Sequence, residues 1–565
     1  MRRGLLMLGL ALVLVAWHPL AGNRGRVSGQ TSQAQALTVA PVTRDALLDW
    51  SNSVDGMLRS EQLQVRRDRE DTLLPGRTIQ QLDQYSNGVP IWGAGVSRQL
   101  EGANVISLFG VLYQDPALDV SPALTQDDAR SIVEQAGGAE LGADHQPKLM
   151  ILPDSGSFRL VWVGEIATVG ANLRLFVDAR TGEIVRRESA RESQLPAGSY
   201  VGHGKGVLGD DKKISTDASS GGFRAFDTIR PPVIATFDLR SNLTRFLQFL
   251  NGNVSLGGSD YATTGSSNDW TDVAVVDAHV YSSYTYDYYS KRFGRQGLDN
   301  RDIPIANLTH IVRRSDAASV SPDLIGQYWA QAAYLGDGIM FYGEGLDFPI
   351  NFGFGPQRWN YLSGALDVVA HELTHGVTDY SSGLIYANES GALNESFSDM
   401  MGTSVEFFYQ PAGTGSMKAD YLIGEDVVTA AASNALNGLR SMADPAQYGQ
   451  PDHFSKRLPY CTTVCDDSND EGNVHGNSGI PNQAFYLAIE GGTNRTSGIR
   501  VTGVGAANRV QIEKVFYRAF AQLMPSNTTF SMARAITLQA ATDLYGVNSS
   551  PYNAVRDAWT AVGVN

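Results

Sequence analysis

The sequence His-Glu-Leu-Thr-His at residues 371–375 is the feature that most limits how this chain can fold. Its two histidines are four positions apart, and an α-helix places residues at that spacing on one face, one turn apart. Two imidazoles arranged in this way can bind a single metal ion. Apolar residues across 365–380 recur at helical spacing, so the sequence predicts a helix that carries a two-histidine metal site. The motif alone also occurs in proteins that bind no metal, so a further ligand must be found before the motif indicates a metal site.

A third ligand and a base are present at suitable positions. A catalytic zinc ion takes about three protein ligands and keeps one position for water. We expect Glu395 to be the third ligand, because it lies 20 residues after His375 on a second predicted helix, 392–409. Asp399, one turn later, is placed to accept a hydrogen bond from a ligand histidine, and Glu372 to act as general base for the water. The alternative, two helices with ordinary surface carboxylates, leaves this combination unexplained.

The bulk composition and the first residues indicate an exported globular protein. The chain has 565 residues, more than one ordinary domain, and its formal charge of −15 argues against nucleic acid as a main partner. Arg2 and Arg3 precede an apolar run at 4–16, and small residues follow, an order typical of a secretory signal over 1–22. A membrane anchor is the alternative, although the run is shorter than the roughly 20 residues that span a bilayer. We expect a secreted, extracellular protein without stable membrane association.

The remaining residues divide into an N-terminal α+β unit and a larger second part. Strand-like runs and one helical stretch fill residues 78–187. A polar segment with Pro and Gly, 189–199, follows and is a natural linker and processing site. The second part is strand-like at first, with a helix predicted over 278–293, and becomes mostly helical beyond Gly364. Two lobes with a cleft between them are expected.

The chain has two cysteines, Cys461 and Cys465. In an oxidising compartment they form either a small local disulfide or two free thiols, and their spacing does not decide between these. A zinc site built on this pair would need two further ligands, which are not seen nearby in the sequence.

Several longer motifs occur in one order along the second part of the chain. They include Val276-Asp-Ala-His, His371 to Asp379, Asn388-Glu-Ser-Gly-Ala-Leu-Asn-Glu and Asn473-Val-His-Gly-Asn-Ser-Gly. In these residues the chain closely resembles the thermolysin-like, or M4, family of zinc metallopeptidases. The resemblance implies an α+β fold, a two-lobed zincin with a β-rich N-terminal lobe and a helical C-terminal lobe, preceded by an α+β propeptide.

The resemblance also implies a precursor organisation. Within the expected propeptide, about 60–113 resemble the fungalysin/thermolysin propeptide unit and about 124–187 the PepSY unit. Such regions assist folding and keep the enzyme inactive until they are cleaved, so the chain's own propeptide is an expected partner and the active form is expected to start near Gly198. The expected segments are a signal peptide (1–22), a propeptide (23–197), a β-rich peptidase lobe (198–363) and a helical peptidase lobe (364–565).

The same resemblance assigns roles that spacing alone does not reveal. His475 matches the family's histidine that stabilises the transition state, and Asp470 matches its orienting carboxylate; from spacing alone His475 reads as a polar loop histidine. Tyr386 matches a second oxyanion donor, and Arg440 matches the arginine that holds the substrate carbonyl. An apolar specificity pocket implies cleavage before bulky hydrophobic residues. The residues that match this pocket are Val368, Ile423, Val427 and Leu439.

Calcium is implied by the same route. Asp367, Glu406, Asp420 and Glu425 match the family's carboxylates around a double calcium site, so two or more structural calcium ions are expected. Clustered carboxylates repel one another unless a hard cation lies among them. The alternative is a solvated acidic surface.

Two departures from the family pattern concern the substrate cleft. The family's edge-strand asparagine, which holds the substrate backbone, is replaced by Ala332, unless the neighbouring Gln331 substitutes for it. The segment with Cys461 and Cys465 precedes Asp470 and is expected to stiffen or reshape the cleft rim.

Taken together, the sequence predicts a secreted, monomeric zinc endopeptidase made as an inactive precursor, with protein and peptide substrates. Two rivals are a catalytically silent binding protein on the same scaffold and a zinc hydrolase that acts on something other than peptides. The three expected ligands, Glu372 and His475 are all present, which argues against the silent protein.

Overall fold

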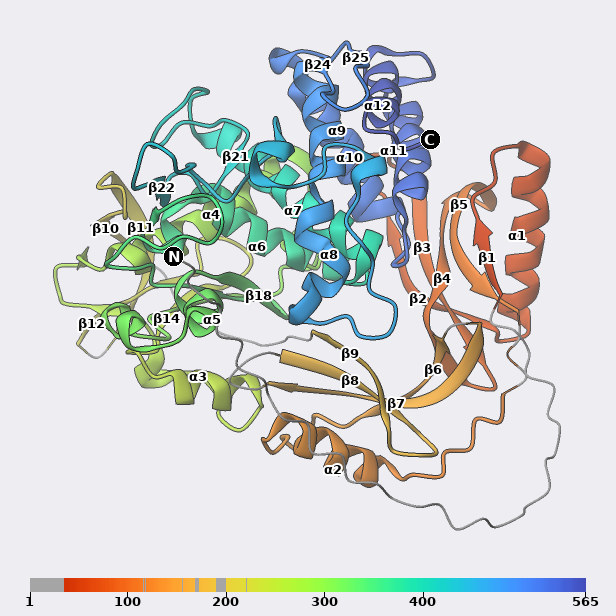
Figure 1. Ribbon diagram of the computed structural model, residues 1–565, viewed down its shortest axis with the longest axis horizontal. Coiled ribbons are helices and arrows are strands. Elements are labelled where there is room, and N and C mark those ends of the chain that lie inside the picture. The colour runs from red at the N-terminus through yellow and green to blue at the C-terminus, as the bar shows by residue number, and fades with distance from the viewer. Residues whose placement is uncertain are drawn as a thin grey trace, which may run out of the picture.

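The computed structural model describes residues 35–114, 116, 118–154, 156–167, 172–189, 200–219 and 221–565. The expected signal peptide, 1–22, lies outside these residues, and so does the expected linker apart from Ser189. Figure 1 shows an N-terminal unit, coloured red to orange, which lies along one side of a larger body that runs from green to blue.

The N-terminal unit is a nine-stranded sheet with two helices. The strand order is β1-β5-β4-β6-β7-β8-β9, and β3 and β2 branch from β4. Helix α2 begins with a capping box, in which Thr125 and Asp128 each bond the other's backbone N–H. The elements are β1 (Ala36–Val39), α1 (Arg44–Arg59), β2 (Leu63–Glu70), β3 (Arg77–Ser86), β4 (Val89–Glu101), β5 (Asn104–Tyr113), α2 (Gln126–Gly137), β6 (Lys148–Asp154), β7 (Ser157–Ala167), β8 (Asn172–Asp178) and β9 (Ile184–Ser189).

The β-rich lobe contains two five-stranded sheets, with orders β15-β12-β11-β10-β16 and β13-β14-β17-β19-β18. In the second sheet β18 is an edge strand that pairs antiparallel with β19. The elements are β10 (Tyr200–Lys205), β11 (Asp211–Ser219), β12 (Gly222–Arg224), β13 (Phe226–Asp227), β14 (Ile234–Asp238), α3 (Leu243–Leu250), β15 (Thr263–Thr264), β16 (Asp269–Trp270), α4 (Val273–Phe293), β17 (Ile305–Thr309), α5 (Pro322–Leu324), β18 (Ala332–Gly336) and β19 (Ile339–Tyr342).

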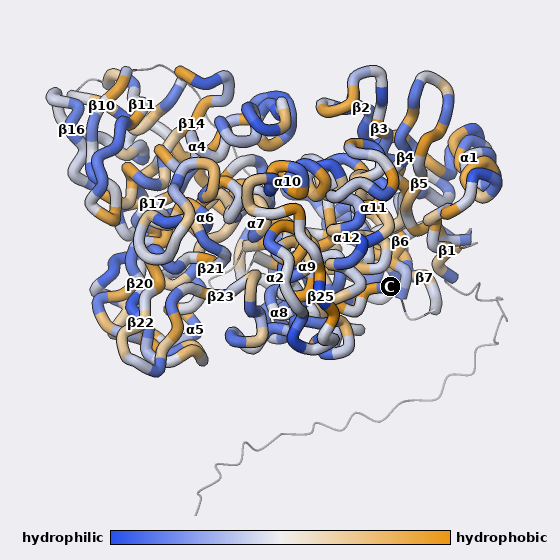
Figure 2. The backbone as a smooth tube through the Cα atoms, turned by 90° about the horizontal axis from the view of Figure 1, so that it is seen from above, coloured by the Kyte–Doolittle hydropathy of each residue, from blue (hydrophilic) through white to orange (hydrophobic). Residues whose placement is uncertain are grey.

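The helical lobe follows, with only short strands between its helices. Figure 2 shows that α9 carries many hydrophobic residues. The elements are β20 (Gln357–Trp359), α6 (Leu366–Asp379), α7 (Asn388–Tyr409), β21 (Leu422–Ile423), β22 (Val428–Ala430), β23 (Arg440–Ser441), α8 (Asp470–Asn477), α9 (Gly479–Glu490), β24 (Gly492–Thr493), β25 (Arg500–Val501), α10 (Arg509–Arg518), the π-helix η9 (Ala519–Leu523), α11 (Phe530–Tyr545) and α12 (Ser550–Ala561).

The largest hydrophobic core joins the two lobes. It contains buried residues of α4, including Tyr288 and Phe293, together with Phe397 of α7 and Trp559 of α12. Burying an aromatic side chain of this size stabilises the fold by roughly 1.5–3 kcal/mol. Helix α4 therefore connects the sheets of the β-rich lobe to the helices of the helical lobe.

The expected fold class, a β-rich lobe followed by a helical lobe with an α+β unit in front, is confirmed. Helix α4 begins at Val273 rather than at 278, because the side chain of Asp272 accepts a hydrogen bond from the backbone N–H of Val275 and caps the helix earlier. The exact segment boundaries, 22, 197 and 363, stay predictions. Within the described residues no helix is both long and apolar enough to cross a bilayer.

Candidate active site

The candidate site lies where α6 packs against α7 (Figure 1). Gly402 of α7 permits this close packing, because a Cβ at this position would lie 2.6 Å from the backbone oxygen of Asp367 on α6. No side chain fits at that distance, so a larger residue would push the two helices apart. The His-Glu-Leu-Thr-His sequence occupies the middle of α6, and Glu395 faces it from α7.

Three side chains converge between these helices. Nε2 of His371 lies 3.0 Å from Nε2 of His375. The Glu395 carboxylate lies 3.5 Å from Nε2 of His371 and 3.4 Å from Nε2 of His375. One donor atom from each residue falls within 4.8 Å of the other two, and all three residues are buried. The predicted ligand set is therefore assembled as one cluster.

The outer nitrogens of the two imidazoles show what this cluster can hold. Nδ1 of His371 lies 2.9 Å from Oδ1 of Asp399, and Nδ1 of His375 lies 2.8 Å from Oδ1 of Asn394. Each Nδ1 faces an oxygen and so carries the proton, which leaves a lone pair on each Nε2 of the neutral rings. Two lone pairs that face each other at 3.0 Å repel unless a cation lies between them. Two imidazoles, one carboxylate and an open side match the donor set that zinc prefers in catalytic sites.

Electrostatics at the cluster favour positive charge. Burial lowers the pKa of His371, but the carboxylates of Asp399 and Glu395 outweigh it and raise this pKa to about 9. Burial raises the pKa of Glu395, yet His475 and the two ligand histidines hold it well below its usual range. In the absence of a metal, protons satisfy this preference, and metal binding would displace them.

Glu372 lies in the same cavity as the ligand cluster but is held by a different element. Its Oε2 accepts a hydrogen bond of 2.8 Å from the backbone N–H of Tyr334 on β18. Only 6% of the residue is exposed. The edge strand thus fixes the carboxylate beside the metal ligands, where a general base is required.

His475 enters the site through an unusual turn at the start of α8. The four residues from Asp470 to Asn473 have φ angles of 51°, 45°, 87° and 61°. Left-handed backbone costs about 1 kcal/mol or more for each residue that is not glycine, so the surrounding contacts must maintain the turn. The turn folds Asp470 back onto His475: its Oδ1 contacts Nδ1, and its Oδ2 accepts from the backbone N–H at 3.0 Å. Burial lowers the pKa of His475, but Glu395 and Asp470 raise it to about 10.

Tyr386 lies between the ligand cluster and His475. Its hydroxyl donates to Oε1 of Glu395 and lies 3.2 Å from Nε2 of His475. The two side chains therefore present a phenol and an imidazole to the same point of the cavity, next to the proposed zinc ligand.

Arg440 of β23 is held by the carboxylate of Asp399, which also contacts His371. Its Nε donates to Oδ2 of Asp399 and its Nη2 to Oδ1, both at 2.7 Å. Asn482 adds a hydrogen bond of 2.8 Å to the same carboxylate. Burial raises the pKa of Asp399, but Arg440 and His371 outweigh it and lower this pKa to about 2. Asp399 is thus ionised and fixes both residues.

The three ligand residues, Glu372, Tyr386, Arg440 and His475 line a cavity of about 260 Å³. The apolar part of its lining includes Val368, Ile423 and Leu439. Val427, predicted to line the same pocket, is buried in the hydrophobic cluster that also contains Val368, and its role in the pocket stays a prediction. Sequence reasoning missed several lining residues, which are Ala330, Ala333, Trp359, Leu362, Asp467 and Glu471.

Of the two departures noted in the sequence, the first lies at this cavity and the second precedes a residue that lines it. Ala332 and Gln331 are part of its lining, and Gln331 is exposed. Cys461 and Cys465 form a disulfide, which resolves the alternative left open above. Asp467, which follows this closed loop, also reaches the cavity.

The four carboxylates predicted to bind calcium interact in one cluster, which Asp426 joins, and all of them except the half-buried Asp420 are buried. Both carboxylate oxygens of Glu406 and of Glu425 are buried without a hydrogen-bond partner. Burial and the neighbouring Asp367 raise the pKa of Glu425 to about 9. Buried, unpartnered carboxylate oxygens of this kind are what a hard cation such as calcium would satisfy.

The fold and the site together define a class: two-lobed metallopeptidases with a catalytic metal held by two histidines and a glutamate between the lobes. Comparison with known proteins agrees. Residues 201–379 match the thermolysin metallopeptidase catalytic domain, and residues 382–564 match the thermolysin metallopeptidase alpha-helical domain. This chain belongs to the thermolysin family of metallopeptidases, and it is a zinc metallopeptidase.

Individual relatives cover most of the chain. The thermostable neutral protease NprT of Geobacillus stearothermophilus is 35% identical over 86% of this chain and 84% of its own length. The bacillolysin of Bacillus cereus is 31% identical over 95% of this chain and 92% of its own. Among solved structures, the precursor of protealysin, a metalloproteinase from Serratia proteamaculans, is 28% identical, with a TM-score of 0.43, over 61% of this chain and 89% of that chain.

Proposed function

We propose that this protein is secreted as an inactive precursor and becomes an endopeptidase that cleaves proteins on the N-terminal side of bulky hydrophobic residues. One observation carries the proposal: the His371, His375 and Glu395 cluster, the Glu372 carboxylate and an apolar pocket share one cavity. Zinc held by the cluster supplies Lewis acidity toward a water and toward the substrate carbonyl.

The chain's own residues then divide the work of proton transfer and charge stabilisation. Glu372, fixed by the β18 backbone, takes a proton from the attacking water and passes it to the leaving amine. Tyr386 and His475 donate hydrogen bonds to the oxygen that becomes negative, and Asp470 holds the His475 ring in the required orientation. Arg440, held by Asp399, binds the carbonyl of the neighbouring substrate residue.

The pocket formed by Val368, Ile423 and Leu439 selects the residue that follows the scissile bond. Burial of a leucine or phenylalanine side chain there contributes roughly 1.5–3 kcal/mol, which small or charged residues do not gain. This supports cleavage before bulky hydrophobic residues.

The protein is made as a secreted precursor, and its folded form binds calcium. The basic and apolar first residues support secretion, and residues 23–197 act as a propeptide that assists folding and inhibits the enzyme. Two or more calcium ions bind at Asp367, Glu406, Asp420 and Glu425, and the buried carboxylate oxygens of Glu406 and Glu425 without hydrogen-bond partners support this assignment. The active form is a monomer that starts near Gly198.

A casein digest separates this proposal from a silent binding protein. We expect wild-type protein to digest casein, to stop when a zinc chelator is added and to resume when zinc is restored. Glu372→Gln should fold, bind zinc and leave both casein and its own precursor uncut, while Asp316→Asn at an exposed position should behave as wild type. Full activity of Glu372→Gln would refute the role of Glu372 as general base. Digestion of a peptide library identifies which residue follows the cleaved bond.

A further inference from the structure

Two carboxyl groups in the lining of the cavity of about 260 Å³ have no part in the mechanism above. Asp467 and Glu471 line this cavity together with the metal ligands and the apolar pocket. Glu471 is buried, with 4% of its surface exposed, whereas Asp467 is exposed. A hydrogen bond joins the two side chains. They therefore form an acidic pair that reaches from the solvent into the substrate cavity.

The surroundings of this acidic pair favour the arrival of a cation. Burial raises the pKa of Glu471, His475 lowers it, and Asp467 raises it again, to about 8. Among the described residues that line the cavity there is one arginine and no lysine. That arginine, Arg440, is bound to Asp399 through two of its nitrogens. A positive charge that enters beside the acidic pair would therefore lower its electrostatic energy.

The acidic pair is held in place by the segment that carries it. Glu471 lies in the left-handed turn before α8, and Asp467 comes two residues after the disulfide of Cys461 and Cys465. The backbone N–H of Cys461 donates to Oδ1 of Asn388 at 2.9 Å, and the Asn388 amide donates to the backbone oxygen of Cys461 at 3.3 Å. The disulfide loop is thus attached to the first residue of α7. Groups that are positioned before a ligand arrives lose less entropy when it binds.

The start of the edge strand β18 contributes another part of the lining. Ala330, Gln331 and Ala332 lie there. Burial and then Asp467 raise the pKa of Tyr328 to about 12, so the acidic pair lies within electrostatic range of the π-helix η3 (Ile325–Trp329) that precedes β18. The small side chains of the two alanines leave room for a long side chain between this segment and the acidic pair.

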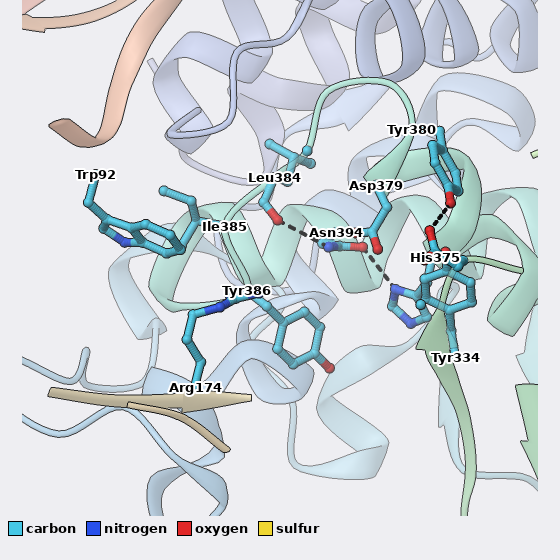
Figure 3. A pocket seen from close by; sticks show the side chains of 13 residues that line it. Trp92, Arg174, Tyr334, His375, Asp379, Tyr380, Leu384, Ile385, Tyr386 and Asn394 are labelled. Atoms are coloured by element: carbon cyan, nitrogen blue, oxygen red, sulfur yellow. Dashed lines mark hydrogen bonds between the residues drawn. The ribbon is translucent and has the colours of Figure 1, made fainter. Parts of the chain in front are cut away.

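The acidic pair lies on one side of the metal ligands only. His375 and Tyr386 also line a second cavity, of about 370 Å³, and neither Asp467 nor Glu471 belongs to its lining. Figure 3 shows His375 and Tyr386 among the side chains that line this second cavity. The apolar pocket and the acidic pair instead share the first cavity. The acidic pair therefore faces substrate residues that follow the scissile bond.

An extended peptide directs successive side chains to opposite sides. The first residue after the scissile bond fills the apolar pocket, so the second side chain points away from that pocket. We infer that Asp467 and Glu471 make the enzyme prefer lysine or arginine as the second residue after the scissile bond. This inference rests on the proposed peptidase function and adds a charge preference to the apolar preference of the neighbouring position. Lysine and arginine suit the site because an apolar stem carries their charge several atoms away from the backbone.

The test measures kcat/KM for three internally quenched peptides that differ at one position. Each peptide has glycine before the cleaved bond and leucine after it, and the next residue is lysine, methionine or glutamate. Methionine is unbranched like lysine but carries no charge. The active wild-type enzyme is assayed with zinc and calcium present, and mass spectrometry of the products verifies cleavage between glycine and leucine. Ratios between peptides are taken within each enzyme, so an effect of a variant on the chemical step cancels.

We expect the lysine peptide to exceed the methionine peptide in kcat/KM at least about tenfold, and the glutamate peptide to fall below both. Glu471→Gln and Asp467→Asn should each reduce the lysine advantage to about threefold or less, and Asp467→Lys should make the glutamate peptide better than the lysine peptide. Asp323→Asn removes a carboxylate at an exposed position outside the lining and should keep the wild-type ratio. Because Asp467 is exposed, its two variants keep the test decisive even where the change at the buried Glu471 prevents folding.

Equal kcat/KM of the wild-type enzyme for the lysine and methionine peptides would overturn the inference. So would a lysine advantage that survives unchanged in both Asp467 variants, or one that is larger when the lysine is moved to the third residue after the bond. Failure of the wild-type enzyme to cleave any of the peptides would instead overturn the proposed peptidase function. The two failures are therefore distinct.

Discussion

Asp399 and Arg440 form a two-point ion pair, in which Nε and Nη2 of Arg440 each lie 2.7 Å from a carboxylate oxygen of Asp399. Oδ1 of the same carboxylate also lies 2.9 Å from Nδ1 of His371. One buried carboxylate thus positions a proposed metal ligand and a proposed substrate-binding arginine at once. This coupling means that the metal site and the substrate site share a support.

Replacing Asp399 should weaken both sites together. Asp399→Asn keeps the size of the side chain but loses the charge that pairs with Arg440, and its amide nitrogen cannot accept from His371. We expect the zinc dissociation constant to rise about 10- to 100-fold and KM for peptides to rise as well. Competition with a zinc chelator measures the first effect, with Asp323→Asn at an exposed position as control. Unchanged zinc affinity would contradict the role given to Asp399.

Removing the His475 imidazole should act on the chemical step. His475→Ala takes away one of two donors to the developing oxyanion, so kcat should fall about 10²–10³-fold with little change in KM. Asp470→Asn should lower kcat by a smaller factor, because the ring remains but loses the carboxylate that orients it. Steady-state kinetics on one hydrophobic peptide checks both. A rise in KM alone would instead place His475 in ground-state binding.

Calcium should control stability in a pH-dependent way. Without calcium, burial raises the pKa of Asp367 to about 7 and of Glu425 to about 9, far above their unfolded values. The folded state then binds protons that the unfolded state releases, so stability falls as pH rises from about 4 toward 9. Calcium, which binds the ionised carboxylates, should remove most of this loss and raise Tm at pH 8 by at least about 5 °C.

Thermal unfolding at pH 5 and pH 8, with calcium and with a calcium-selective chelator, measures this effect. Glu406→Gln should reduce the difference that calcium makes, because it removes one of the buried ligands. Equal melting temperatures in all four conditions would contradict the calcium site.

The apolar pocket should respond to a change in its volume. Leu439→Trp fills the end of the cavity, so kcat/KM for cleavage before phenylalanine should fall at least about tenfold relative to cleavage before alanine. Val515→Ala, in the main core and outside the cavity lining, should lower stability by about 1 kcal/mol or more and leave the ratio unchanged. Digestion of matched peptides gives the ratio. An unchanged ratio in Leu439→Trp would contradict the assigned pocket.

The sequence predicted the centre of the site well because its geometry is local. The spacing of His371 and His375 fixes their positions on one helix, and Glu395 follows on the next helix in the chain. Partners brought from distant elements were harder to predict. The Tyr334 backbone N–H that holds Glu372 belongs to a strand 38 residues away in sequence, and a backbone group leaves no mark on composition.

Other residues were missed although a signal existed. Asn394 precedes Glu395 by one position, and its amide oxygen is the acceptor for His375, a role that a carboxylate or a backbone carbonyl more often fills. Docking of the N-terminal unit through Asp71 and Arg518 had no sequence signal, since the two are 447 residues apart.

The metal content of the protein tests the central claim most directly. Purified wild-type protein, dialysed and analysed by inductively coupled plasma mass spectrometry, should contain one zinc ion per chain at the helix of residues 371–375, and Glu372→Gln should contain the same amount. His375→Ala and Glu395→Ala should each lose it, because two donors cannot replace the set of three. Zinc-free wild-type protein that still cleaves peptides, or full zinc content in both ligand variants, would contradict the account.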